Sequence, residues 1–159
     1  MPATRSGVAQ RRVRSASPEE TRALAAALAS AARPGDLIAL HGELGAGKTQ
    51  LAKGFGAGLG VTATINSPSY VLMAEYEGRL PLFHLDLYRL ADASDALAGG
   101  LLDERQAAGV SLVEWAERLG PALPAARLDI VIVGSADESR SICLTATEAD
   151  LERYLDVVP

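Results

Sequence analysis

The sequence predicts an α/β fold: a mixed, mainly parallel sheet with helices on both faces and an antiparallel hairpin. The first observation is an apolar, strand-like run at residues 36–41 (DLIALH), followed by a glycine-rich octapeptide at 42–49 (GELGAGKT) and a helical pattern at 50–59. The second is the recurrence of short apolar runs along the rest of the chain, separated by turn residues. A length of 159 residues suits one domain with a core of its own.

The chain is expected to begin with a flexible basic arm over residues 1–16, ahead of a single folded domain over 17–159. Ser17 and Glu20 have the spacing of a capping box, in which each side chain satisfies a free backbone N–H group. A proline occupies the first helical position, where its fixed φ is already helical. These signals predict a helix over 18–32.

The remaining elements are expected from apolar runs and from the turn residues between them. They are an antiparallel hairpin of strands 69–76 and 80–85, two short helices within 91–108, strands at 110–113, 127–133 and 140–145, and a last helix at 148–155. Thr147 is expected to cap that last helix, because threonine is a favoured residue at this position.

The octapeptide fits G-x-x-x-x-G-K-[ST], the pattern of a phosphate-binding P-loop. Its glycines let backbone N–H groups turn toward an anion, and the following helix adds free N–H groups and the positive end of its dipole. In this pattern Lys48 reaches the β- and γ-phosphates, and the hydroxyl of Thr49 binds Mg²⁺. The sequence therefore predicts a P-loop NTPase domain that binds ATP and Mg²⁺. The residues expected to contact the nucleotide are Leu44, Gly45, Ala46, Gly47, Lys48, Thr49 and Gln50.

A P-loop that hydrolyses its nucleotide also needs a carboxylate near the metal, usually at the end of a neighbouring strand. Two apolar runs end in an acid, one at Asp86 and one at Glu114. Ligands of open α/β sheets bind outside the carboxyl ends of the strands, so both acids are candidates on the residues alone. His84 precedes the first acid and is expected to be a hydrogen-bonded core or rim residue rather than a metal ligand.

Four segments together resemble the TsaE family, which is also called YjeE. They are residues 45–49 (GAGKT), residues 67–70 (SPSY), residues 84–90 (HLDLYRL) and the pair Glu114-Trp115. The combination of H-x-D-x-Y-R-L with a later E-W is far more specific than the P-loop alone, and the resemblance covers nearly the whole chain. Ser69 stands where the family usually has threonine, and this change keeps the hydroxyl.

The resemblance implies a cytoplasmic, Mg²⁺-dependent ATP hydrolase that is required for threonylcarbamoylation of adenosine 37 in tRNA. It implies that Thr49 and Glu114 contact the metal and that Asp86 is a Walker-B-like acid. Together with Lys48, and with Ser69 near the γ-phosphate, Asp86 completes the expected catalytic set. The resemblance also implies partner proteins, a threonylcarbamoyl transferase and its paralogue, through which the protein acts on tRNA indirectly.

Composition limits the other functions. The formal net charge is −5, which provides no broad basic surface for DNA or for direct RNA binding. No stretch reaches the ~18 apolar residues of a membrane span, so no membrane contact is expected. A nucleotide site requires cytosolic nucleotide, which favours a cytoplasmic location. Cys143 is the only cysteine, so no internal disulfide can form.

Two other functions stay open on the residues alone. One is a small P-loop kinase that phosphorylates a nucleotide or a metabolite, although no arginine-rich lid segment follows the P-loop helix. The other is a nucleotide-binding module whose only output is partner binding. Isolated P-loop hydrolases without an arginine finger are slow, so weak ATPase activity that partners stimulate is the expected behaviour.

Overall fold

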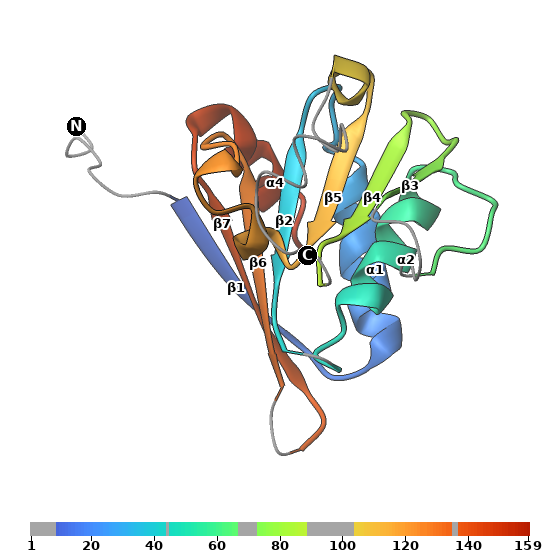
Figure 1. Cartoon of the computed structure of the whole chain (residues 1–159). Helices are drawn as coiled ribbons and strands as arrows, with labels where there is room; N and C mark the ends of the chain where they lie inside the picture. The colour runs from blue at the N-terminus through green and yellow to red at the C-terminus, as the bar shows by residue number, and fades with distance from the viewer. Residues whose placement is uncertain (1–8, 44, 67–72, 89–103, 135–136) are drawn as a thin grey trace.

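The computed structural model describes residues 9–43, 45–66, 73–88, 104–134 and 137–159. Its elements in chain order are β1 (Ala9–Ser15), α1 (Pro18–Ala29), β2 (Leu37–His41), α2 (Lys48–Gly58), β3 (Met73–Tyr76), β4 (Leu82–Asp86), η1 (Glu104–Ala108), β5 (Val110–Glu114), η2 (Ala116–Ala122), β6 (Leu128–Gly134), β7 (Arg140–Ala146), η3 (Ala149–Glu152) and α4 (Arg153–Asp156). Figure 1 shows α1 and α2 side by side against one face of the sheet.

The seven strands form one sheet in the order β1-β7-β6-β2-β5-β4-β3. The four central strands, β6, β2, β5 and β4, run parallel, whereas β7, β1 and β3 are antiparallel to their neighbours. This arrangement confirms the predicted α/β fold with a mixed sheet and a parallel core. The pairing of β3 with β4 confirms the predicted hairpin, and β6 pairs with β7 in the same way.

The N-terminal segment corrects one prediction. A flexible arm was expected over residues 1–16, but residues 9–15 form β1 and pair with β7 along their whole length. Val13 packs against the core and Ser15 is buried, so the strand alternates as a half-buried strand does. The strand contains three arginines, so its sequence lacks the clear alternation of apolar and polar residues that predicts a strand. Residues 1–8 lie outside the described residues.

The first helix confirms the predicted capping box. The hydroxyl of Ser17 accepts a hydrogen bond from the amide of Glu20 at 3.1 Å, and the Glu20 carboxylate accepts one from the amide of Ala16 at 2.7 Å. These contacts satisfy N–H groups that the helix itself leaves free. Among the described residues, no helix has both the length and the apolar character that a membrane crossing requires.

The C-terminal helix is shorter than predicted. In place of one helix at 148–155, a single 3₁₀ turn (η3) leads into the short helix α4. Thr147 does not cap it, because its hydroxyl is bonded to the backbone of Arg127 at the start of β6. The first part of the predicted strand 69–76 and most of the predicted helices within 91–108 fall outside the described residues.

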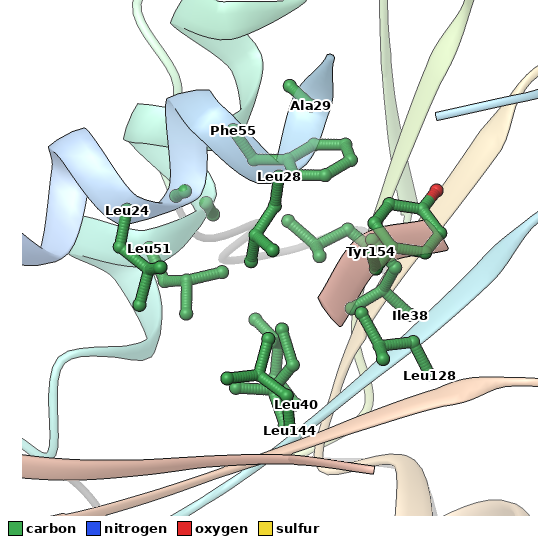
Figure 2. Close-up of a cluster of buried hydrophobic side chains, with 14 of the residues drawn as sticks. Leu24, Leu28, Ala29, Ile38, Leu40, Leu51, Phe55, Leu128, Leu144 and Tyr154 are labelled. Carbon is green, nitrogen blue, oxygen red and sulfur yellow. The ribbon is translucent and has the colours of Figure 1, made fainter. Parts of the chain in front are cut away.

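The main core lies between the sheet and the layer formed by α1, α2 and α4. Figure 2 shows the side chains that meet there: Leu24, Leu28 and Ala29 of α1, Leu51 and Phe55 of α2, Ile38 and Leu40 of β2, Leu128 of β6, Leu144 of β7 and Tyr154 of α4. The hydroxyl of Tyr154 donates to the Asp36 carboxylate at 2.5 Å and ties the C-terminus to the start of β2. The P-loop helix α2 therefore rests on a continuous apolar layer.

The opposite face of the sheet carries a second, smaller apolar cluster. In the described part of the chain, the 3₁₀ helix η2 covers it with Ala116 and Leu119, in place of a full α-helix. Phe83, Leu85 and Val113 of the central strands pack there. Alternate residues of β4 and β5 face the other way, so His84, Asp86 and Glu114 lie on the same face as α2.

Glycines of α2 allow an unusually close approach of α1. A Cβ atom on Gly54 would lie 2.3 Å from the carbonyl oxygen of Arg22, and one on Gly58 would lie 2.6 Å from that of Ala26. Backbone atoms of α1 cannot move aside without moving the whole helix. The two helices are therefore in backbone contact at these positions. This contact fixes the position of α2, whose first turn forms the end of the octapeptide.

Candidate functional site

A cavity of about 330 Å³ opens at the carboxyl ends of β4 and β5, beside the N-terminus of α2. It is lined by Gly45, Gly47, Lys48, Thr49, Gln50, Asp86, Tyr88, Glu114 and Trp115. The structure thus brings the P-loop and both candidate acids together, as expected for neighbouring parallel strands that end at one edge of a sheet. Leu44 and Ser69, which were also expected at the site, lie outside the described residues.

The loop itself has the backbone that an anion cradle requires. Gly47, the N-cap of α2, has φ 114° and ψ 14°, a conformation that favours glycine. Gly42 lies so close to β6 that an added Cβ atom would be 2.7 Å from the carbonyl oxygen of Ile132. The N-cap residue is itself a glycine, so it places no side chain over the first turn of α2, where an anion could bind.

Lys48 is folded into this cavity. Its side chain is buried, and its ammonium group donates to the carbonyl oxygen of Gly42 and lies 3.9 Å from the centroid of the Trp115 ring. Burial lowers the pKa of Lys48, and the nearby carboxylates of Glu114, Glu117 and Asp86 oppose that shift. A phosphate group in the cavity would replace a weak ring contact with a charge-assisted hydrogen bond.

The two acids come from adjacent strands and are direct neighbours, because Asp86 and Glu114 are register partners in the β4–β5 pair. Glu114 is only 3% exposed, whereas Asp86 is half-buried. Burial raises the pKa of Asp86, the amide of Tyr88 lowers it through a hydrogen bond, and the Glu114 carboxylate raises it further. The Asp86 carboxyl group therefore holds a proton more strongly than an exposed aspartate does.

These donors suit a hard divalent cation. Mg²⁺ is bound through oxygen atoms, typically one or two carboxylates, a hydroxyl, water and the phosphates of a nucleotide. The wall of this cavity provides the hydroxyl of Thr49 and the carboxylates of Asp86 and Glu114. The carboxylate of Glu114 is buried, and its Oε2 atom lies 2.6 Å from Nε2 of His84.

Aromatic side chains form one wall of the cavity. The Trp115 ring lies 5.0 Å from the Tyr88 ring, and the Arg118 guanidinium lies 6.0 Å from the Tyr88 ring on the outside. Trp115 has a left-handed backbone with φ 57°, which is rare for a bulky residue and directs the chain away from β5 immediately after Glu114. Both rings belong to the lining of the cavity.

Arg140 is a P-loop contact that sequence reasoning missed. Its Nε atom donates to the carbonyl oxygen of Ala46 at 2.8 Å, and Nη2 donates to that of Gly45 at 3.3 Å. These contacts tie two carbonyl groups of the loop to β7. Arg140 lies 94 positions after Ala46 in the sequence, and no sequence motif links the two residues.

A second cavity, of about 260 Å³, lies on the other side of the loop. It is lined by Ser17, Pro18, Thr21, Gly45, Ala46, Gly47, Gln50, Glu138 and Arg140. It joins the start of α1 to the β6–β7 turn across the P-loop. Of the expected nucleotide contacts, Gln50 lines both cavities, whereas Ala46 lines only this second one.

Comparisons with known proteins agree on one family. A family model described as threonylcarbamoyl adenosine biosynthesis protein TsaE matches residues 15–142. The tRNA threonylcarbamoyladenosine biosynthesis protein TsaE of Bacillus subtilis (strain 168) is 48% identical over 134 residues, which are 84% of each chain. The protein of the same name from Treponema pallidum (strain Nichols) is 41% identical over 108 residues, 68% of this chain and 80% of the relative.

A crystal structure of YdiB from Bacillus subtilis has the same fold. It superposes with a TM-score of 0.79 at 39% sequence identity, over 95% of both chains. The shared fold includes the mixed sheet with its parallel core. The match of the family model to most of the chain, together with these identities, shows that the chain belongs to the TsaE family.

Proposed function

We propose that this chain is a Mg²⁺-dependent ATP hydrolase that is required for the threonylcarbamoylation of adenosine 37 in tRNA. The observation that carries the proposal is a single cavity that joins a P-loop to the side chains of Thr49, Asp86 and Glu114. Membership of the TsaE family supplies the pathway, since the relatives are named as tRNA threonylcarbamoyladenosine biosynthesis proteins.

Each residue has a chemical task in this proposal. The loop amides and Lys48 bind the β- and γ-phosphates, and the hydroxyl of Thr49 and the carboxylate of Glu114 hold Mg²⁺, which neutralises charge on the phosphates when it is bound. Asp86 orients the attacking water and accepts a hydrogen bond from it, a task that the raised pKa of its carboxyl group suits. Ser69 is expected near the γ-phosphate because it stands where the TsaE family usually has a threonine and keeps the hydroxyl.

The two acids are expected to fail in different ways when they are removed. Glu114→Ala should weaken Mg²⁺-dependent nucleotide binding about tenfold, the equivalent of about 1.4 kcal/mol, because a metal ligand acts in the ground state as well as the transition state. Asp86→Ala should lower turnover at saturating ATP about tenfold and change affinity little, because a group that orients water acts mainly in the transition state. Titration calorimetry and phosphate release separate the two effects.

Glu75→Ala is the matched control, since Glu75 is an exposed carboxylate on the neighbouring strand β3. It should leave both measurements unchanged. If a structure with bound metal and nucleotide placed both carboxylates more than about 8 Å from the ion, beyond a water-bridged contact, the metal assignment would be wrong.

Partners are expected to control the rate. None of the described residues that line the cavity is an arginine, and an arginine finger accounts for much of the rate of fast P-loop hydrolases. We therefore expect slow ATP hydrolysis by the isolated protein and an increase of about tenfold or more when the threonylcarbamoyl transferase and its paralogue are added. The acidic chain should bind tRNA poorly without them, given its net charge of −5.

Phosphate release with and without the purified partners, at fixed salt, tests this expectation. The Lys48→Ala protein, mixed with the same partners, controls for hydrolysis by a contaminant. Equal rates in both conditions, together with no nucleotide-dependent complex in a pull-down, would count against an ATPase that acts on an assembly. Transfer of the phosphate to a small acceptor would instead identify the kinase alternative.

A further inference from the structure

His84 is a buried polar residue that the proposed function does not use. It lies on β4 with no exposed surface, two residues before Asp86 and on the same face of the sheet. Its register partner on β5 is Leu112, yet its side chain contacts Glu114, two residues further along β5. His84 Nε2 lies 2.6 Å from Glu114 Oε2, and both side chains are buried.

The hydrogen-bond pattern fixes which ring nitrogen carries the hydrogen. A metal-binding carboxylate is ionised and can only accept, so with Glu114 in that role the Nε2 atom of His84 is the donor. The Nδ1 atom is buried and has no hydrogen-bond partner among the described residues. Glu114 alone therefore sets the tautomer and the orientation of this ring. A buried histidine with only a structural role would be expected to form hydrogen bonds through both ring nitrogens.

The arrangement of Glu114 and His84 resembles that of a metal-binding carboxylate and the residue that orients it through a hydrogen bond. In metal sites, ligating carboxylates are themselves hydrogen-bonded, and the supporting partners orient them toward the ion. We propose that His84 is a positioning residue: its Nε2–H group holds Oε2 of Glu114, so that Oε1 is the oxygen that serves Mg²⁺. This inference rests on the proposed function, because it requires Glu114 to be a metal ligand.

Two substitutions separate positioning from simple core hydrogen bonding. In His84→Gln the amide nitrogen stands the same number of bonds from the backbone as the imidazole Nε2, so the donor to Glu114 is kept. In His84→Asn the amide nitrogen stands one bond closer to the backbone and cannot reach Glu114. Both variants bury a neutral amide in the same place, which makes them a matched pair.

The readout is the ratio of nucleotide affinities with Mg²⁺ and with EDTA, measured by calorimetry with a non-hydrolysable ATP analogue. His84→Gln should keep the wild-type ratio, whereas His84→Asn should lower it by about tenfold to a hundredfold and leave the affinity in EDTA unchanged. An unchanged ratio in His84→Asn, or an equal loss in both variants, would overturn the inference. If the wild-type protein bound the nucleotide equally well with Mg²⁺ and with EDTA, both the metal site and the proposed function would be contradicted.

A measurement on the wild-type protein does not depend on the folding of any variant. The chain has two histidines, so the imidazole signals of His84 can be assigned in a ¹⁵N-labelled sample by comparison with His41→Gln. We expect the Nε2–H tautomer, with a shift of this proton when Mg²⁺ is added to the nucleotide-bound protein. The Nδ1–H tautomer, or a signal that Mg²⁺ leaves unchanged, would contradict a positioning role.

Discussion

Lys48→Ala is expected to lower nucleotide affinity by roughly tenfold to a hundredfold, because the substitution removes a charge-assisted contact worth about 1.5–3 kcal/mol. Turnover should fall at least as far, since the same ammonium group faces the charge that develops on the γ-phosphate. In the described structure this group contacts the carbonyl of Gly42 and the Trp115 ring. Neither contact holds the core together, so the variant should fold normally.

Lys53→Ala provides the control, because Lys53 is the only other lysine and lies on the same helix, outside the cavity. Calorimetry with ATP and a thermal melt of each variant complete the measurement. Wild-type affinity and turnover in a folded Lys48→Ala protein would contradict the assignment of the P-loop.

Gly54→Ala is expected to destabilise the protein although alanine is the better helix former. Overpacking of a tight contact costs about 1–3 kcal/mol, whereas the gain in helix propensity is about 1 kcal/mol. The added methyl group would lie 2.3 Å from a carbonyl oxygen of α1 and 2.6 Å from the Cα atom of Arg22, both backbone atoms. Because both clashing atoms are backbone atoms, we expect a cost toward the upper end of this range, a net loss of about 2 kcal/mol and a fall in melting temperature of roughly 4–8 °C.

The same substitution two residues along the helix is the matched control. At Gly56 the added methyl group would meet the Cδ1 atom of Ile65, the end of a flexible side chain that can change rotamer. Gly56→Ala should therefore cost less than Gly54→Ala in a urea or thermal melt. An equal or higher melting temperature for Gly54→Ala than for the wild type would show that the two helices can separate without cost.

Local patterns predicted the elements of the site well. The octapeptide placed the loop between β2 and α2, and apolar runs ending in Asp86 and Glu114 predicted two acids at one edge. This worked because parallel strands that start a βα unit end at the same edge of a sheet, so position within an element decides position in space. The capping box at Ser17 was predicted for the same reason, since it depends only on neighbours in sequence.

Contacts between distant residues could not be predicted in this way. The His84–Glu114 pair depends on strand register, and Arg140 reaches the loop from another hairpin. The strand at residues 9–15 was missed because its apolar positions are separated by arginines, so that pairing with β7 decides its structure. In each case the deciding interaction lies outside any window of local sequence.

The aromatic wall of the cavity has a practical consequence. Trp115 is the only tryptophan in the chain, and its ring lies 3.9 Å from the ammonium group of Lys48. Indole emission responds to nearby charge, and any phosphate that draws the lysine away changes the charge over the ring face. The single tryptophan is therefore a built-in optical probe at the proposed nucleotide site, and its emission should report occupancy in unlabelled samples in real time.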